Sequence, residues 1–266
     1  MLRVSNLKKT FNEGTVNEKV ALNDLSLTLP DGDFAAIVGS NGAGKSTFFN
    51  AIAGSFYVDD GEIFLDDLDI TFMPEHKRSR IIGRLFQDPL LGTAPHMTIE
   101  ENLTIAYLRA SGHTSAFSRS AAKDRIFFRE QLSELHMGLE DRMEQPVGLL
   151  SGGQRQALTL LMATVVTPKL LLLDEHTAAL DPKTAEKVLD LTAKIVRERR
   201  ISCLMVTHNM HQALELGKRT LMMDGGRIVF DVSGETRAAM TVQDLLDRFK
   251  QGAGSELDND RILLSE

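Results

Sequence analysis

Apolar and polar residues alternate in part along two segments near the N-terminus, residues 3–7 and 20–29. Alternation with a period of two turns one face of an extended chain toward a core, so both segments are predicted to be antiparallel strands. A turn at residues 30–33 leads into residues 34–38, which are all apolar, as in a strand buried on both faces. Further strands are predicted at residues 62–65 and 81–86.

The pattern becomes helical in the middle of the chain, roughly residues 89–149. Thr98 is a predicted N-cap, since Glu100 and Glu101 follow in the first turn, where negative charge is favoured. A polar stretch, residues 111–120, leads to a second helical segment that ends near residue 136. This block is predicted to be a mostly helical insertion into an otherwise alternating α/β chain.

Strands and helices alternate again after the insertion, and a hairpin is predicted around Asp224, Gly225 and Gly226. A short amphipathic helix at residues 242–249 and a glycine-containing acidic tail, predicted to be loosely ordered, end the chain. The remaining helices are predicted at residues 45–53 (ending at Gly54), 154–166, 182–199 and 208–216, and the remaining strands at residues 170–173 and 201–206.

Composition narrows the class of protein. With 266 residues and 42% hydrophobic residues, the chain has the length of one large α/β domain or of a domain with an inserted subdomain. A net charge of −7 argues against nucleic acid as the main partner. Cys203 is the only cysteine, which excludes an intramolecular disulfide, and its apolar surroundings predict a buried thiol in a strand. Without a signal sequence or an apolar stretch of about 20 residues, the chain is expected to be cytoplasmic and to reach a membrane only through another subunit.

The first chemical motif matches the phosphate-binding pattern G-x-x-x-x-G-K-[ST] between the apolar strand at 34–38 and the helix at 45–53. Glycines let the backbone fold around phosphates with its N–H groups pointing inward, and the helix directs its positive end at the anion. Lys45 is the expected cation for the β and γ phosphates, and the Ser46 hydroxyl is the expected ligand for Mg²⁺. The motif comprises Gly39, Ser40, Asn41, Gly42, Ala43, Gly44, Lys45, Ser46 and Thr47. The sequence therefore predicts that the chain binds ATP with Mg²⁺.

The second motif is an apolar strand, residues 170–173, that ends in Asp174 and Glu175. The carboxyl ends of parallel strands are where a nucleotide site forms. Asp174 is predicted to hold Mg²⁺, and Glu175 to orient and deprotonate the attacking water. Two solvated loop acids are the alternative for this motif taken alone.

The third motif places two glycines at the start of a helix, in the run Leu150, Ser151, Gly152, Gly153 and Gln154. Exposed N–H groups at a helix N-terminus form an anion site, although a simple helix-capping turn is the alternative. One nucleotide does not need two phosphate cradles, so this one is predicted to face the nucleotide of a second copy of the chain.

These motifs, in this order, resemble the ATP-binding-cassette (ABC) ATPases over about residues 2–230. The resemblance implies a phosphate-loop NTPase core with an N-terminal antiparallel β subdomain and an inserted helical subdomain. The implied bounds are residues 1–88 and 150–235 for the core, 89–149 for the helical subdomain, and 236–266 for a C-terminal helix and tail.

The resemblance also implies roles for single residues. Gln87 is similar to the glutamine that contacts Mg²⁺ and water and leads to the transmembrane partner. Asp181 resembles the residue of a loop that crosses the dimer interface, and His208 the histidine that contacts the γ-phosphate. Phe11 stands where an aromatic ring stacks on adenine, with ordinary core packing as the alternative. Without the resemblance, Gln87 and His208 are unremarkable residues that follow strands.

One position departs from the family: His176 stands where Asp-Glu is commonly followed by proline. A metal or pH-sensing role for His176 finds no second ligand at helical spacing. The run DEHTAALDP, residues 174–182, resembles a bacterial branch of importers for small solutes such as amino acids. The resemblance implies a homodimer, integral membrane permease subunits, an extracytoplasmic substrate-binding lipoprotein, and a location at the cytoplasmic face of the inner membrane.

Three other functions remain open from the sequence. An exporter or lipoprotein-extraction ATPase would carry a similar cassette. A soluble ABC ATPase acting on DNA or ribosomes is disfavoured, since there is one cassette here and no long heptad run between the motifs. A regulatory module without turnover is disfavoured by the joint presence of Lys45, Asp174, Glu175 and His208.

Overall fold

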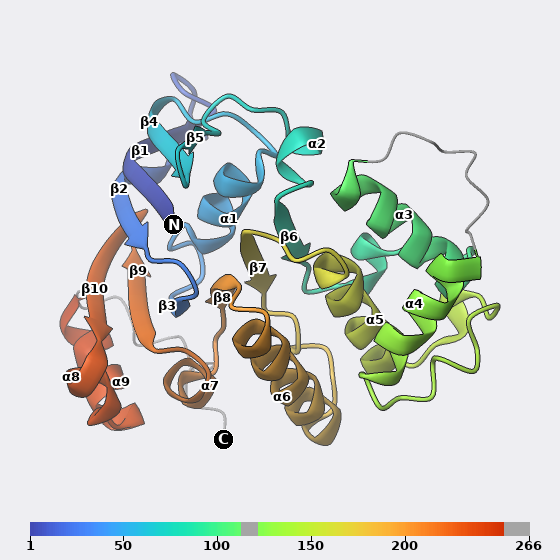
Figure 1. Ribbon diagram of the computed structural model, residues 1–266. Helices are drawn as coiled ribbons and strands as arrows, with labels where there is room; N and C mark the ends of the chain where they lie inside the picture. The colour runs from blue at the N-terminus through green and yellow to red at the C-terminus, as the bar shows by residue number, and fades with distance from the viewer. Residues whose placement is uncertain (113–121, 253–266) are drawn as a thin grey trace. The chain divides into compact units, whose positions relative to one another are not determined.

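The computed structural model describes residues 1–112 and 122–252 (Figure 1), which fall into two compact units. The first unit joins residues 1–78 to residues 202–252, and the second unit is residues 79–201. The predicted acidic tail and most of the polar stretch at 111–120 lie outside the described residues. In the described part of the chain, no helix has both the length and the apolar character needed to cross a bilayer.

The first unit begins with an antiparallel sheet in the strand order β2-β1-β4-β5, in agreement with the alternation seen in the sequence. Along β1, Leu2, Val4 and Leu7 are buried while the residues between them are more exposed, so this sheet has one core face. The short strand β5 was not predicted. The strands are β1 (Leu2–Phe11), β2 (Lys19–Leu29), β4 (Asp60–Leu65) and β5 (Leu68–Asp69).

A second sheet of the first unit has the order β10-β9-β3-β8, in which β3 runs parallel to both of its neighbours. Every residue of β3 and β8 is buried, including Cys203, whose burial raises its pKa well above the usual value. The predicted hairpin at Gly225 and Gly226 joins β9 to β10. These strands are β3 (Phe34–Gly39), β8 (Ser202–Val206), β9 (Arg219–Asp224) and β10 (Arg227–Ser233).

Five described helices belong to the first unit, and α1 follows the prediction from its first residue to its last. Gly54 ends α1 in the left-handed region, as expected of a glycine C-cap. Helix α7 begins at Met210, two residues later than predicted, because Asn209 caps it. The helices are α1 (Lys45–Ala53), α2 (Glu75–Arg78), α7 (Met210–Glu215), α8 (Gly234–Ala238) and α9 (Val242–Gly252), of which α2 and α8 were not predicted.

The second unit contains a pair of parallel strands and the helical insertion. Thr98 caps α3 with a full capping box, in which Thr98 and Glu101 each accept the other's backbone N–H. The elements are β6 (Ile82–Leu85), η1 (Pro89–Gly92), α3 (Ile99–Ser111), α4 (Ala122–Ser133), η2 (Val147–Leu149), α5 (Gly152–Thr164), β7 (Leu170–Asp174) and α6 (Pro182–Glu198).

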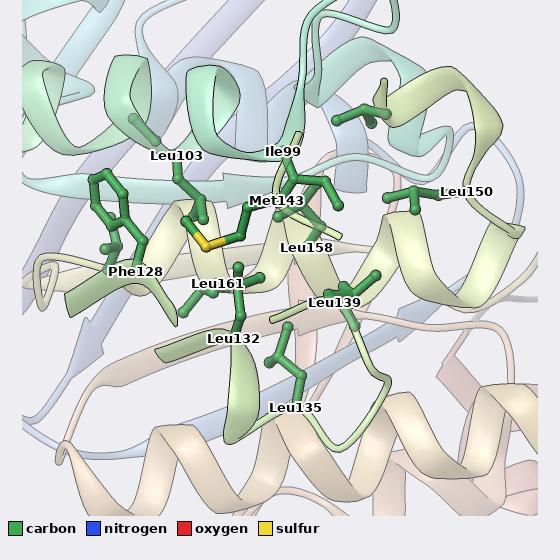
Figure 2. Packing of buried hydrophobic residues seen from close by; sticks show 14 residues of the cluster. Ile99, Leu103, Phe128, Leu132, Leu135, Leu139, Met143, Leu150, Leu158 and Leu161 are labelled. Carbon is green, nitrogen blue, oxygen red and sulfur yellow. The ribbon is translucent and has the colours of Figure 1, made fainter. Parts of the chain in front are cut away.

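The insertion has a core of its own that it shares with α5. Figure 2 shows Leu103 of α3, Met143 of the loop after α4 and Leu161 of α5 pointing toward one another. Phe128 and Leu132 bring α4 to the same cluster, and both are fully buried. Contacts of this kind group the insertion with β6, α5, β7 and α6 in one unit, while the narrower bounds 89–149 stay a prediction.

The C-terminal end of α1 rests on a buried cation. Arg78 is fully buried and donates hydrogen bonds from Nη1 to the carbonyl oxygens of Ala51 (2.8 Å) and Ile52 (2.9 Å), the orphan acceptors of the last helical turn. Its Nη2 and Nε donate to the carbonyl oxygens of Thr71 (2.9 Å) and Met73 (2.7 Å). One guanidinium therefore joins the end of α1 to the chain that leads toward β6.

Replacing this guanidinium is expected to cost more than an average core substitution. Arg78→Met leaves four backbone carbonyls with no replacement donor from the side chain, so the free energy of unfolding should fall by about 3 kcal/mol or more. Urea denaturation measures the change. The matched control is Lys77→Met, an exposed neighbour in the same short helix. Equal stability of the two variants would contradict the capping role of Arg78.

Candidate functional site

The turn between β3 and α1 is built around close backbone contacts that admit only glycine. A Cβ on Gly39 would lie 2.3 Å from the carbonyl oxygen of Met223 on β9, and a Cβ on Gly44 would lie 2.6 Å from that of Ala21 on β2. Gly44 also has a φ of 101°, in the left-handed region. The glycines that the sequence motif requires are therefore needed to bring the loop against two neighbouring strands.

Helix α1 starts without a side-chain cap and has no acidic residue in its first turn. No carboxylate in the first turn of α1 therefore neutralises the positive end of the helix dipole. Lys45, at the first position of α1, is only 6% exposed and donates from Nζ to the carbonyl oxygens of Gly39 (2.7 Å) and Ser40 (2.9 Å). The ammonium group thus lies inside the loop, bound to two of the loop's own backbone carbonyls.

His208 emerges beside this loop. Strand β8 is parallel to β3, with Ile37 opposite Val206, and the N–H of Thr207 donates to the carbonyl oxygen of Ile37 (3.2 Å). Gly39 lies two residues after Ile37, and His208 lies two residues after Val206. Because the two strands run in the same direction, both residues lie at the carboxyl edge of the sheet. Asn209 then caps α7 by accepting from the N–H of Gln212 (3.1 Å). His208 therefore lies on the phosphate-loop side of the first unit, while its contact to a γ-phosphate stays a prediction.

Phe11 ends β1 and is half-buried. Its ring meets Phe56 edge-on at a centroid distance of 5.3 Å, and the Lys9 ammonium lies 5.6 Å from both ring centroids. Both the stacking role and the core alternative involve such a partly packed ring, so the assignment of Phe11 to adenine stays a prediction.

One cation near the loop was missed by sequence reasoning. Lys19 is paired with Phe11 across the β1–β2 ladder, and its Nζ lies 3.7 Å from the place of a Cβ on Gly42. Nothing in the sequence motif indicates this neighbour, because β2 was predicted to begin at residue 20. The register of an antiparallel pair brings the two together.

In the second unit, β7 delivers the two acids. Four buried leucines precede Asp174, and Glu175 follows with a positive φ of 45°. A non-glycine residue in this region is uncommon and is held there by its surroundings. The N–H of Ala178 donates to the carbonyl oxygen of Glu175 (3.0 Å), which begins the tight turn after the strand.

Gln87 lies near the same edge as the acids. Strands β6 and β7 are parallel, with Leu85 opposite Leu173, and Gln87 and Glu175 each follow by two residues. Gln87 is exposed, and Asp88 caps the following η1 by accepting from the N–H of Leu90 (2.9 Å). The structure therefore brings Gln87, Asp174 and Glu175 to one edge of the second unit.

His176 points into the protein. It is 2% exposed, and its Nε2 lies 3.3 Å from Oγ1 of Thr192 on α6. Burial lowers the pKa of His176 to about 4, so the imidazole is neutral at physiological pH. A buried neutral ring on a threonine does not favour the metal or pH-sensing role considered from the sequence.

The third motif forms the first turn of α5, which begins at Gly152, two residues earlier than predicted. Ser151 caps it: its Oγ accepts from the N–H of Gln154 (3.3 Å), and Gln154 Oε1 accepts from the N–H of Ser151 (3.2 Å). Ser151 and Gly152 are exposed, while Gly153 is buried. The capping alternative and the anion-site prediction therefore share one geometry, in which the helix start faces outward.

Gly153 is packed directly against α6. A Cβ on Gly153 would lie 2.1 Å from Cγ2 of Thr184, whereas one on Gly152 would lie 3.3 Å from Cδ2 of Leu180. Thr184 is bound in turn to the N-cap of α6, since its N–H donates to Asp181 Oδ1 (3.1 Å). Hydrogen bonding from Thr184 also lowers the pKa of Asp181. Asp181 and the third motif thus belong to one packed junction.

Beside this junction the surface is hollowed into an open groove of about 610 Å³. The residues that line the groove include three from the start of α5 and three from α6, namely Ser151, Gly153, Gln154, Thr184, Lys187 and Lys194. The start of α5 is therefore accessible from outside the second unit.

A buried strand, a glycine-rich loop with an inward lysine, and an uncapped helix define a phosphate-loop nucleotide-binding protein. Comparison with known proteins identifies the family within this class. The sequence profile described as "ABC transporter" matches residues 22–178. A "Tyrosine transport ATP-binding protein" of Clostridioides difficile is 42% identical over 250 residues, covering 94% of this chain and 99% of that protein.

Other relatives and solved structures agree. The methionine import ATP-binding protein MetN of Rhizobium johnstonii is 35% identical over 232 residues, and the chain covers 60% of that longer protein. A dimeric post-hydrolysis ATP-binding cassette bound to ADP and phosphate has a TM-score of 0.75 at 27% identity, covering 88% of this chain and 98% of that one. A nucleotide-free cassette of an ABC transporter has a TM-score of 0.76 at 26% identity, with 93% and 95% covered. The chain belongs to the ABC transporter family, as one of its ATPase subunits, and the predicted fold class is confirmed.

The contact between Gly153 and Thr184 yields a stability test that separates packing from chemistry. Gly153→Ala should destabilise the protein by about 1–2 kcal/mol, although alanine is the better helix former, because its methyl group overlaps Cγ2 of Thr184. Adding Thr184→Ser removes Cγ2 and should restore the melting temperature. Gly152→Ala is the control and should be nearly neutral. A fully stable Gly153→Ala protein would contradict this account of the junction.

Proposed function

We propose that the chain acts as a homodimer in which each site is completed by two copies. The observation that carries this proposal is that one chain has two helix starts suited to phosphate: the start of α1 at Gly44, which has no side-chain cap, and the exposed start of α5 at Ser151 and Gly152. A two-fold arrangement gives each nucleotide the loop of one copy and Ser151 to Gln154 of the other. The similarity to a dimeric cassette supports the same arrangement.

The chemistry proposed for the site is water attack on the γ-phosphate of ATP. Lys45 would exchange its loop carbonyls for phosphate oxygens, a step that needs little motion because the ammonium already lies inside the loop. Glu175 is the proposed base that orients and deprotonates water, and His208 the proposed contact to the γ-phosphate. Lys19 adds a second positive charge near Gly42.

The residues proposed for Mg²⁺ fit the ion, because the Ser46 hydroxyl, the Gln87 carbonyl and the Asp174 carboxylate are all oxygen donors. Mg²⁺ would neutralise charge on the phosphates when it is bound. Phe11 is proposed to stack on adenine, and Asp181 to act at the interface between the copies. Hydrolysis removes a contact that both copies share, and opening of the dimer follows from that loss.

The proposed task is uptake of a small solute of the amino-acid type. The similarity to a tyrosine transport protein over nearly the whole of both chains supports an amino-acid solute. Relatives named for methionine, spermidine/putrescine and sulfate/thiosulfate import support uptake over the exporter alternative. The chain would sit at the cytoplasmic face of the inner membrane on integral permease subunits, which would work with an extracytoplasmic substrate-binding lipoprotein.

The role of Glu175 is tested by Glu175→Gln. The amide keeps the size of the side chain but cannot accept the proton, so ATP should still bind while steady-state hydrolysis falls at least ~100-fold. Size-exclusion chromatography with ATP should then show a stable dimer, because the shared γ-phosphate is no longer removed. Undiminished ATPase activity of Glu175→Gln would rule out Glu175 as the base.

The proposal that two copies complete each site is tested by mixing two variants, Ser151→Arg and Lys45→Ala. Ser151→Arg alone and Lys45→Ala alone should be inactive, the first because its bulky cation blocks the partner's nucleotide. In a mixed dimer, one site carries both defects and the other carries neither, so part of the activity should return. A Ser151→Arg protein with wild-type activity, or mixtures that stay fully inactive while forming dimers, would contradict completion of the site by the second copy.

The transported solute is tested in vesicles that contain the chain with the permease that co-purifies with it. ATP inside the vesicles should drive uptake of labelled tyrosine when the cognate binding lipoprotein is present, and Glu175→Gln should abolish it. Uptake of another amino acid instead would correct the solute but keep the importer. Release of a solute in place of uptake would favour the exporter.

A further inference from the structure

We propose that His176 is a positioning residue for hydrolysis: its hydrogen bond to Thr192 on α6 holds the backbone turn that presents Glu175. The inference rests on the proposed role of Glu175 as the base. It concerns a residue whose side chain points away from the site edge and into the second unit.

The direction of the hydrogen bond follows from the bonds of Thr192. The Thr192 hydroxyl donates its one proton to the carbonyl oxygen of Val188, at 2.7 Å within the same helix. Toward His176, Thr192 Oγ1 is therefore an acceptor, and the imidazole must donate. The geometry assigns the tautomer with the proton on Nε2 and a bare Nδ1.

The hydrogen bond between His176 and Thr192 ties the start of the turn after β7 to helix α6, so that the chain between them forms a closed loop. The backbone leaves β7 at Asp174, turns through Glu175 and His176, and returns as α6, which begins at Pro182. Thr192 lies almost three turns along α6, so the His176 bond joins the first residues of the turn to the middle of the helix. Because Thr192 is 1% exposed and His176 is 2% exposed, water does not compete for this bond.

The turn needs such an anchor. Glu175 has a φ of 45°, a conformation that costs of order 1–3 kcal/mol and persists only where the surroundings impose it. The neighbouring peptide is fixed on one side by the bond from the Ala178 N–H to the Glu175 carbonyl. The His176 side chain supplies the second fixed point, directly after the acid. A relaxed turn would move the carboxylate away from the line of attack, and a shift near 1 Å lowers turnover by up to about 100-fold.

The first experiment measures ATP hydrolysis by the full chain in His176→Leu, Thr192→Val and the double variant. Each single variant should lower kcat ~10-fold while KM and nucleotide affinity stay within about twofold, because only the base is displaced. The double variant should lose the same ~10-fold, since both changes remove one bond. His176→Gln places an amide N–H near the position of Nε2 and should recover most of kcat.

Matched controls separate this role from general damage to the fold. Thr164→Val removes another buried hydroxyl that donates within its own helix, Thr164 Oγ1 to Leu160 (2.8 Å), and should leave kcat unchanged. Wild-type kcat in folded His176→Leu, or losses that multiply to ~100-fold in the double variant, would overturn the proposal. If Glu175→Gln is inactive while His176→Leu is fully active, only the positioning role is wrong. If Glu175→Gln keeps wild-type turnover, the base assignment itself is wrong.

A second experiment does not depend on turnover or on the stability of a variant. In the wild-type chain labelled with ¹⁵N-histidine, the shifts of the His176 ring should show a protonated Nε2 and a bare Nδ1. His211, an exposed histidine of α7, serves as the reference for a ring in exchange with water. A proton on Nδ1 of His176 would break the proposed bond and refute the inference.

Discussion

The two ends of helix α1 need opposite treatment of their backbone groups, and the contacts of the first unit provide both. At its N-terminus the helix dipole must stay without a side-chain cap so that an anion can take that place, and Gly44 provides no such cap. At its C-terminus the orphan carbonyls must be satisfied inside the protein, and the Arg78 guanidinium does this. The phosphate loop is then held from outside by β2 and β9, whose carbonyl oxygens leave no room for a Cβ at Gly44 or Gly39. A helix fixed in this way can orient its N–H groups before a nucleotide arrives.

The second unit also has a helix start at its surface, the start of α5, but it is stabilised in a different way. Its helix start at Ser151 is capped, but by a capping box that leaves Ser151 and Gly152 at the surface. The position of that start depends on α6, because Gly153 packs on Thr184. Helix α6 also holds the turn after Glu175 through Thr192. One helix therefore contacts both the turn of the proposed base and the motif proposed to face a second copy, which gives a physical route for coupling the two.

Much of this architecture was predictable from short-range patterns. The strand at 34–38, the helix at 45–53 with Gly54 at its end, and the cap at Thr98 follow local rules of burial, propensity and capping, and the structure confirms them. The motif with Lys45 and the motif with Asp174 and Glu175 together indicated nucleotide chemistry, because their residue types are uncommon in that order. Short elements such as α2, β5 and α8 were not predicted, since a segment of a few residues is too short to show a periodic pattern of apolar positions.

The sequence by itself determined the family, the class of chemistry and the main elements, because glycine, lysine and paired acids at fixed spacing leave few other uses. Only the tertiary structure decided which distant residues support them. Arg78 under α1, Lys19 beside Gly42, Thr184 against Gly153 and Thr192 bound to His176 all depend on strand register or helix packing. Such contacts join residues far apart in the chain, or on facing elements, and no local pattern encodes them. His176 shows the difference most clearly: the sequence marks it as a departure from proline, whereas its buried bond to α6 explains what the histidine can do.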